Sequence, residues 1–583
     1  MQDYTPPIND YAFLLKHVLG LDAHMAQLDM EVDTDLAITI LEEAGRFCAD
    51  IAFPLNRSGD EEGSRLIDGA VKTPDGFPEA YRAFARAGWT SLSADVAHGG
   101  QGLPFVLQLW LDEMMSAANL SFGLFPGLGR GATEAIAAHA SNELKAIWLP
   151  PLISGEWTGA MALTESSAGT DLGLLRTKAV PHANGSYAIS GTKIFISCGD
   201  HDFGGNIVHL VLARLPDAPA GVKGISLFLV PKFLPDGEGG FTLRNSMSVG
   251  ALEQKMGIHA QPTCVMNYDG ATGWLVGEAH RGLAAMFTMM NAERLFVGIQ
   301  GLGLAGAAYQ QAVAYARDRL QGRSSDGTRS PVPIIDHADV RKMLLSVRSF
   351  VEGGRALAGW TALQLDRARH HPDAVERAHA DGLVALLTPV VKAGFTDLGF
   401  ESTVLAQQVF GGHGYIREWG VEQYVRDARI AQIYEGTNGV QAMDLVGRKL
   451  ALENGAVAER YFALMAEDLA RAQEVSGVQD IAHRTGEALA SLRAVTAHLR
   501  GVDADSAGAA ATDYLRLFIL VSLGWMWTQM AVAAQGAGDD RLCRAKQDIA
   551  AFFAARMLPH SKGLVAAIEA GAQPVMALNE DLF

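Results

Sequence analysis

The chain has 583 residues, of which 49% are hydrophobic and 19% charged, and its formal net charge is −18. This composition excludes an intrinsically disordered protein, and the negative charge opposes a general nucleic-acid binder. The length predicts about three or four domains.

The four cysteines are few and widely spaced. No pair of them has metal-ligand spacing, so the sequence predicts neither a metal site nor a disulfide framework. The N-terminal residues MQDYTPPINDYAFLLKHVLG lack a basic segment followed by an apolar core, so we expect no signal peptide. These features indicate a cytoplasmic protein.

Helical patterns dominate residues 1–156, for example in Asp35–Ile51, where apolar residues recur at helical spacing. The residue pattern changes from helical to β-rich in residues 157–278, where short β-rich runs are separated by Gly, Asn, Asp and Pro. These runs are Tyr187–Ile189, Lys193–Ser197, Ile207–Ala213, Ile225–Val230 and Cys264–Tyr268. We therefore predict an N-terminal helical domain and a middle β domain.

Long Ala- and Leu-rich helical patterns return in residues 279–450, and residues 451–583 add a helical extension with an internal loop expected at Gly501–Ala511. The predicted fold class is α+β. Leu517–Ala534 is almost long enough to cross a membrane, but it contains Ser, Thr and Gln. We interpret it as a buried helix of a bundle and keep peripheral membrane contact as the alternative.

Two segments of the β domain could bind a flat ligand. Met161–Thr170 reads MALTESSAGT, where Thr164 offers a hydroxyl at a strand-to-loop junction and small residues follow. Ser190–Ser197 reads SGTKIFIS, a turn feeding a strand that places an aromatic ring and a hydroxyl on one face. Taken alone, the first segment is equally well an ordinary loop, and the phenylalanine of the second is more often a core residue.

Two further blocks lie in the helical part. NAERLFVGIQGLGL (Asn291–Leu304) leads to Arg319. Its planar guanidinium suits phosphate binding, but taken alone such a residue is more often a solvated charge at the end of a helix. Gly301–Gly306 satisfies G-x-G-x-x-G, but it lies inside a helical pattern instead of after a strand, so we interpret these glycines as helix-packing residues. The last block comprises QVFGGHGY (Gln408–Tyr415) and IAQIYEGTNGVQ (Ile430–Gln441).

Glu435 in the last block follows a helix and precedes Gly and Thr, a setting in which a carboxylate can approach a ligand beside available backbone N–H groups. The four blocks, in this order over about residues 30–450, resemble the FAD-dependent acyl-CoA dehydrogenase family. The resemblance implies a β-barrel-like middle domain between helical domains. It also implies that Glu435 removes the α-proton of an acyl-CoA while the flavin accepts the β-hydride.

The resemblance also assigns binding residues. Phe195 and Ser197 stand where many members carry Trp and Thr, which keeps an aromatic face and a hydroxyl at the flavin. The residues that it assigns to FAD are Met161, Leu163, Thr164, Gly169, Thr170, Phe195, Ser197, Arg319, Gln408, Gly411, Gly412 and Thr437. Those that it assigns to the substrate are Thr170, Arg294, Tyr434 and Gly436.

Glu293 complicates the choice of base. It occupies the position where some branched- and long-chain members place their catalytic carboxylate, and those members generally lack the Glu of the later block. This chain has both residues. We predict Glu435 as the base and Glu293 as a residue of the pocket wall or of an ion pair.

The length, the extension and the segments YTPPINDYAFLLKHVL and PVPIIDH resemble a long bacterial subgroup of the family. This subgroup includes enzymes that oxidise 3-(methylthio)propanoyl-CoA in dimethylsulfoniopropionate breakdown. The implied substrate is that thioester, or alternatively another short- to medium-chain acyl-CoA of β-oxidation. The resemblance further implies an electron-transferring flavoprotein as acceptor and a homodimer or dimer of dimers, with the Arg319 and Gln408 blocks crossing the subunit interface.

Three rival functions share the fold. An acyl-CoA oxidase would admit O₂ to the reduced flavin, and a nitroalkane oxidase-like enzyme would use Asp as its base where this chain has Glu435. A non-enzymatic, DNA-binding relative would need a basic C-terminal region. Residues 451–583 contain 11 basic and 16 acidic residues, which opposes that function.

Overall fold

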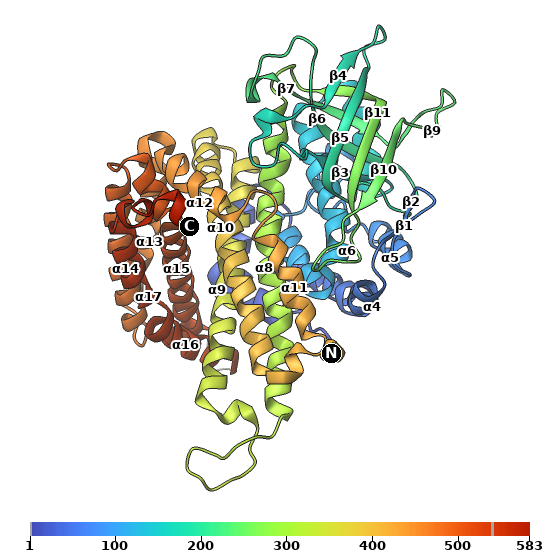
Figure 1. The fold of residues 1–583 in the computed structure, drawn as a ribbon. Coiled ribbons are helices and arrows are strands. Elements are labelled where there is room, and N and C mark those ends of the chain that lie inside the picture. Colours follow the sequence, from blue (N-terminus) through green and yellow to red (C-terminus); the bar gives the residue numbers. More distant parts are fainter. Residues whose placement is uncertain (1–2, 538–540) are drawn as a thin grey trace. The chain divides into compact units, whose positions relative to one another are not determined.

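The computed structural model describes residues 3–537 and 541–583 and divides into two compact units (Figure 1). The first unit comprises Met1–Gly45, Pro104–Ala117 and Val297–Phe583 and is helical. The second unit comprises Arg46–Leu103 and Ala118–Phe296 and contains the large sheet.

The sheet of the second unit has seven strands that close on themselves. Strand β11 pairs with β10, β5 and β7, and β7 returns to β6, which also pairs with β3 and β4. This closure agrees with the barrel-like domain expected from the sequence. The strands are β3 (Thr158–Ala162), β4 (Lys178–Pro181), β5 (Tyr187–Ser197), β6 (Ile207–Arg214), β7 (Ile225–Pro231), β10 (Met247–Leu252) and β11 (Thr263–Val276).

The continuous apolar runs predicted as strands became β6 and β7, which are buried along almost their entire length. The turn predicted at Ser190–Thr192 is wrong. Strand β5 runs through these residues because the backbone ladder with β11 continues there, with Gly191 opposite Tyr268. Smaller elements complete the unit: β1 (Arg65–Ile67) with β2 (Ala70–Lys72), β8 (Phe233–Pro235) with β9 (Phe241–Arg244), α4 (Pro54–Glu62), α5 (Phe77–Arg86) and α7 (Asn142–Ser154).

Two long helices have residues in both units. α6 (Phe105–His139) is interrupted at Asn119, whose backbone is not helical, and α8 (Gly282–Asp318) is assigned as a single helix. The remaining helices have residues in the first unit: α1 (Ile8–Phe13), α2 (Leu21–Gln27), α3 (Thr34–Phe47), α9 (Ala338–His370), α10 (Ala374–Val409), α11 (Val421–Ala431), α12 (Asn438–Gly447), α13 (Ala456–Ala472), α14 (Gln479–Leu499), α15 (Ala504–Gly536), α16 (Arg541–Phe552), α17 (His560–Glu569) and α18 (Gln573–Met576).

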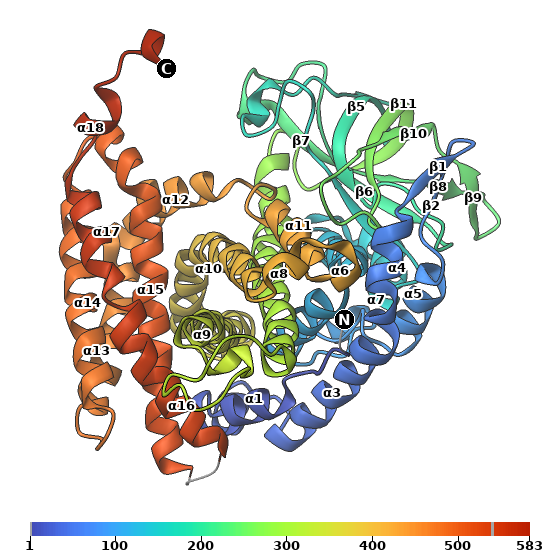
Figure 2. The ribbon, with the colours of Figure 1, turned by 60° about the horizontal axis from the view of Figure 1, so that its bottom comes forward.

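The C-terminal extension packs within the first unit as a layer of helices in which α15 contacts α9, α10 and α14 (Figure 2). The loop predicted at Gly501–Ala511 is wrong in its length, because α15 already begins at Ala504. Asp503 caps this helix by accepting a hydrogen bond from the Ser506 N–H at 2.8 Å. The alanines that follow favour helix over loop.

α10 and α15 are long and apolar enough to cross a membrane by length and composition. Their most apolar windows are 78% and 83% buried, respectively, within the structure. Burial of this extent is typical of core helices, in agreement with the interpretation of Leu517–Ala534 as a buried helix.

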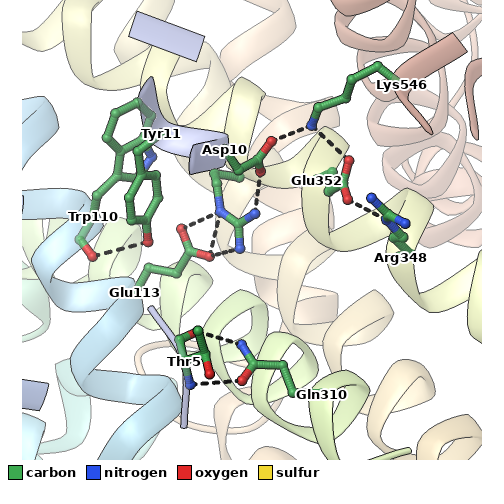
Figure 3. A network of polar contacts seen from close by, with 10 residues as sticks. Thr5, Asp10, Tyr11, Trp110, Glu113, Gln310, Arg348, Glu352 and Lys546 are labelled. Carbon is green, nitrogen blue, oxygen red and sulfur yellow. Dashed lines mark hydrogen bonds and ion pairs between the residues drawn. The ribbon is translucent and has the colours of Figure 1, made fainter. Parts of the chain in front are cut away.

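A buried ionic network fastens the extension to the rest of the first unit (Figure 3). Lys546 of α16 contacts Asp10 of α1, and its distance to the Glu352 carboxylate of α9 is 2.7 Å. Arg355 of α9 pairs with Asp10 and, at 2.6 Å, with Glu113 of α6. The ammonium of Lys546 therefore offsets the carboxylates of Asp10, near the opposite end of the sequence, and of Glu352, in its middle part.

We expect Lys546→Met to lower the free energy of unfolding by about 3–5 kcal/mol, because removal of one partner leaves buried charge uncompensated. Urea denaturation followed by circular dichroism, together with calorimetric Tm values, measures the change. Lys562→Met on the exposed surface of α17 is the matched control. A Lys546 variant as stable as this control would contradict the structural role of the network.

Asp366 of α9 provides a pH-dependent contact. Its carboxylate accepts the Phe105 N–H at the start of α6 at 2.9 and 3.1 Å. Burial raises the pKa of this carboxyl to about 7. Because the native pKa lies above the value of about 3.9 for an unfolded chain, the stability contribution is present below about pH 4 and is lost as the pH rises through about 7.

We expect Asp366→Asn, which keeps a carbonyl oxygen for the Phe105 N–H, to flatten this pH dependence. The Tm of the wild type falls more than that of the variant between about pH 5 and pH 8. Differential scanning calorimetry across this range measures the difference. Parallel Tm profiles for the two proteins would overturn the assignment.

Candidate active site

Strand β3 of the second unit and the loop after it carry the first set of predicted site residues, with Met161 in the strand and Leu163 and Thr164 in the loop. Leu163 is buried, whereas Met161 and Thr164 are partly exposed. The Thr164 carbonyl accepts a hydrogen bond from the Ile194 N–H of β5 at 2.9 Å. The structure therefore brings together the two segments of the β domain, Met161–Thr170 and Ser190–Ser197, that the sequence analysis singled out for binding a flat ligand.

Phe195 has an unusual backbone for its residue type. Its φ is +60°, and the register between β5 and β11 shifts at this point, which marks a β-bulge. The side chain is 59% exposed although it belongs to a sheet with a well-packed core. A left-handed conformation at a bulky residue costs free energy and is found preferentially at binding sites. Ser197, two residues later, is partly exposed.

The small-residue turn of the same loop is open. Gly169 and Thr170 are exposed, and a Cβ atom added at Gly169 would meet no other atom within 4 Å. The loop is held at its ends, since the Glu165 and Ala168 backbones exchange hydrogen bonds of 3.0 and 3.1 Å. Gly169 and Thr170 can therefore approach a ligand without displacing protein atoms.

Glu435 lies in the first unit, in the connection between α11 and α12. Its φ is +57°, and that of Gly436 is +83°, so two successive residues are left-handed. Thr437 then caps α12 by accepting a hydrogen bond from the Val440 N–H at 3.3 Å. The connection is thus a tight turn with Glu435, a non-glycine residue, in a strained position.

Buried polar side chains hold this turn. Lys392 of α10 donates to the Gly436 carbonyl at 2.7 Å and to the Asn438 amide oxygen at 2.8 Å. Gln441 of α12 donates to the Glu435 carbonyl at 3.2 Å. Tyr434 hydrogen-bonds through its hydroxyl to the Gln300 side chain of α8. Sequence analysis missed Lys392, although a lysine within the apolar pattern LLTPVVKAGF was the signal that could have found it.

Glu293 and Arg294 lie in the part of α8 that belongs to the second unit, and both are buried. A Cβ atom added at Gly131 would lie 2.5 Å from the Glu293 Oε1 atom, so the glycine leaves room for this carboxylate. Arg294 lies over the Phe287 ring at 5.7 Å and donates to Asn291 at 3.4 Å. The role of Glu293 stays a prediction.

The predicted phosphate-binding residues of the first unit are exposed. Arg319 directly follows α8, and Gln408 is the second-last residue of α10, shortly before Gly411 and Gly412, both of which are open to solvent. Tyr315 links the two blocks: its ring stacks on Phe410, with centroids 4.3 Å apart, and its hydroxyl lies 2.9 Å from His413 Nδ1. The structure therefore brings the Arg319 and Gln408 blocks to one surface.

Family models match nearly the whole chain. They are the acyl-CoA dehydrogenase N-terminal domain over residues 34–156, the middle domain over 160–271, the C-terminal domain over 280–451 and an acetyl-CoA dehydrogenase C-terminal-like domain over 461–579. The chain belongs to the acyl-CoA dehydrogenase family. It is an oxidoreductase of the FAD-dependent class that this family comprises.

Among curated relatives, the 3-methylmercaptopropionyl-CoA dehydrogenase of Ruegeria pomeroyi is 46% identical, over 95% of this chain and 96% of that protein. A broad-specificity linear acyl-CoA dehydrogenase of Mycobacterium tuberculosis is 32% identical over the full length of both chains. The structure of an acyl-CoA dehydrogenase from Bacillus anthracis, complexed with FAD, has a TM-score of 0.74 at 19% identity and covers 95% of this chain and 90% of that one.

The residues of the second unit fit a flavin. The exposed Phe195 ring supplies an aromatic surface, and the partly exposed Thr164 and Ser197 supply hydroxyls. The open turn at Gly169 leaves space for a ligand to approach the backbone. A flat heteroaromatic ring with polar edges needs this combination of stacking surface and hydrogen-bonding groups.

We expect Lys392→Met to slow flavin reduction by an acyl-CoA by about 10- to 100-fold, because the turn that carries Glu435 loses two of its hydrogen bonds. FAD content should stay at the wild-type level. Anaerobic stopped-flow absorbance at about 450 nm measures the reduction rate. Lys342→Met on the exposed surface of α9 is the control, and a Lys392 variant that matched it in rate would contradict the positioning role.

Proposed function

We propose that this enzyme oxidises 3-(methylthio)propanoyl-CoA to 3-(methylthio)acryloyl-CoA, with Glu435 as the catalytic base. The proposed substrate is supported by the 46% identity to the Ruegeria pomeroyi protein along nearly the full length of both chains. Other short- and medium-chain acyl-CoA thioesters are the alternative substrates, which the likeness to the broad-specificity enzyme supports.

The observation that carries the assignment of the base is the conformation of Glu435. The turn keeps Glu435 in a left-handed conformation. Buried side chains bond the two carbonyls at this point, Gln441 that of Glu435 and Lys392 that of Gly436. Strain of this kind persists only where surrounding contacts enforce it, and it is concentrated at functional sites. Glu293 lies within a regular helix and has no comparable backbone feature.

The proposed reaction removes two hydrogens from adjacent carbons. The Glu435 carboxylate takes the proton from Cα of the thioester, and the Cβ–H bond breaks with its electron pair, so a trans double bond forms between the two carbons. FAD, when bound, supplies the acceptor for that hydride. The Glu435 N–H donates to the thioester carbonyl and stabilises the negative charge that develops on its oxygen.

The other site residues divide into two proposed groups. Arg294, Tyr434, Gly436 and Thr170 contact the substrate. The residues that contact FAD are Met161, Leu163, Thr164, Gly169, Thr170, Phe195, Ser197 and Thr437 at the ring and ribityl side, and Arg319, Gln408, Gly411 and Gly412 at the diphosphate of a neighbouring subunit.

We propose a homodimer, or a dimer of dimers, as the functional assembly. Its support is the exposed surface that joins Arg319 to the Gln408 block, where Tyr415 is 84% exposed and Ile416 is 47% exposed. An electron-transferring flavoprotein is the proposed acceptor, as the family resemblance implies. We further propose a cytoplasmic location, which is supported by four buried cysteines that form no disulfide.

The experiment is anaerobic reduction of the FAD-loaded enzyme by 3-(methylthio)propanoyl-CoA, butyryl-CoA and octanoyl-CoA. We expect rapid bleaching of the flavin band in the wild type, fastest with the methylthio substrate. Glu435→Gln, which keeps the shape but cannot accept the proton, should lose about 10³-fold or more of the rate. Glu293→Gln is the matched variant and should retain most of it.

Each alternative has its own result. Retained bleaching in Glu435→Gln with loss in Glu293→Gln would move the base to Glu293. Faster bleaching with butyryl-CoA or octanoyl-CoA would replace the proposed substrate. FAD binding without reduction by any of the three thioesters would contradict the proposed function for this substrate class.

A further inference from the structure

The second unit contains a buried ion pair behind the flavin-facing segments. Lys193 of β5 is fully buried, and its ammonium donates to the Leu163 carbonyl at 2.8 Å and to the Glu165 Oε1 atom at 2.9 Å. Both acceptors belong to the loop after β3. A buried ammonium that lacked such acceptors would be strongly unfavourable, so the loop position and the lysine position depend on each other.

Glu165 also binds a third segment, residues 176–177, at the same place. Its carboxylate accepts the Arg176 N–H at 2.6 Å, the Thr177 N–H at 3.0 Å and the Thr177 hydroxyl at 2.7 Å. A Cβ atom added at Gly191 would lie 2.4 Å from the Thr177 Oγ1 atom. The glycine two residues before Lys193 therefore makes room for the threonine that completes the carboxylate site.

The ion pair lies directly beside the bulge. Lys193 and Ile194 immediately precede Phe195, and each is bonded to the loop: Lys193 to Leu163 through its side chain, and Ile194 to the Thr164 carbonyl through its backbone N–H. Residues 163–165 and 193–194 are thereby clamped together. Thr164 lies within this clamp and Phe195 directly follows it, and the proposed function assigns both residues to the flavin ring.

Burial lowers the pKa of Lys193 to about 8, against the opposing effect of Glu165. Burial raises the pKa of Glu165, but the Lys193 ammonium and the hydrogen bonds from Thr177 and Arg176 outweigh it and hold the pKa below its ordinary value. Each partner thus favours the charged form of the other. Removal of one partner leaves an isolated charge in a site closed to water.

We propose that Glu165 and Lys193 are positioning residues for the FAD ring. The pair fixes the loop of Thr164 and the bulge of Phe195 relative to each other, so that the aromatic surface and the hydroxyl are in place before the cofactor binds. This inference rests on the proposed function, because it takes Thr164 and Phe195 as ring contacts. It adds two residues that do not themselves touch the cofactor.

The alternative role is plain stabilisation of the β domain, and the chain offers a matched control for it. Lys232 and the buried Asp200 form a second lysine–carboxylate pair in the same unit, with a distance of 2.5 Å. Lys232 also donates to the His201 carbonyl at 3.4 Å. Within residues 3–537 and 541–583, this pair bonds to neither the Leu163–Glu165 loop nor residues 193–195.

The test compares the apoproteins of the wild type, Lys193→Met, Lys232→Met and the double variant Glu165→Gln/Lys193→Met. FAD affinity is measured by titration of flavin fluorescence, thermal stability by circular dichroism, and the environment of the ring by its visible absorption spectrum. We expect Lys193→Met to weaken FAD binding by about tenfold or more and to alter the spectrum. Lys232→Met should lower the Tm with little change in FAD affinity.

The double variant separates the two roles. Removal of both charges should restore much of the lost Tm, because no uncompensated carboxylate remains. It should not restore FAD affinity, because the bond from Lys193 to the Leu163 carbonyl is still missing. Recovery of FAD affinity in parallel with Tm would overturn the positioning role and leave a stabilising one.

Thr177→Val keeps the test decisive if Lys193→Met does not fold. This variant loses only the hydrogen bond that the Thr177 hydroxyl donates to the Glu165 carboxylate. We expect a smaller loss of FAD affinity in this variant, and unchanged affinity would overturn the proposal. Wild-type apoprotein that bound no FAD would instead contradict the proposed function. The failure of one hypothesis is thereby distinguished from the failure of the other.

Discussion

The cost of burying a lysine ammonium is the constraint on which the functional parts of this protein depend. Within residues 3–537 and 541–583, three lysines are fully buried: Lys193, Lys392 and Lys546. Each must find oxygen acceptors inside the protein, because an unpaired buried charge is far more costly than an unpaired amide. Each does so by bonding a segment distant in sequence, namely the loop after β3, the turn before α12 and helix α1. The three ammonium groups thereby hold three segments, two of them through a backbone carbonyl and the third through the Asp10 carboxylate.

Two of these lysines are associated with strained residues that have proposed roles in the reaction. Phe195 lies two residues after Lys193 in β5, and Glu435 lies in the turn held by Lys392. Both have positive φ angles, which a bulky side chain adopts only when its surroundings enforce them. Each unit of the chain therefore carries one proposed set of groups, a ring-binding surface in one case and a base in the other, on a backbone that contacts within the protein hold in shape. Such preorganisation is how a protein lowers a reaction barrier without paying for rearrangement during the reaction.

The sequence predicted the fold class, the buried runs that became β6 and β7, and the burial of the α15 segment, because these follow from local hydrophobic patterns. It also proposed roles for Glu435, Thr164 and Phe195 through motifs whose residue types suit the chemistry, and these roles stay predictions. It did not predict the bulge at Phe195, which depends on register with β11, or the continuous strand through Gly191. Nor could it pair Lys546 with Asp10, 536 residues apart, since the partner of a buried charge is determined by tertiary packing. The start of α15 was missed for a local reason: an Asp503 cap is easily read as part of a polar loop.

Proton abstraction by Glu435 is the central claim, and it can be observed without hydride transfer. (Methylthio)acetyl-CoA has acidic hydrogens at Cα but sulfur in place of the β-carbon, so only the first half of the reaction is open to it. The measurement is deuterium uptake at Cα of this thioester in D₂O, followed by mass spectrometry, with wild type, Glu435→Gln and Glu293→Gln loaded with FAD. We predict rapid exchange in the wild type and in Glu293→Gln and none above background in Glu435→Gln. Exchange by Glu435→Gln at the wild-type rate would contradict Glu435 as the base.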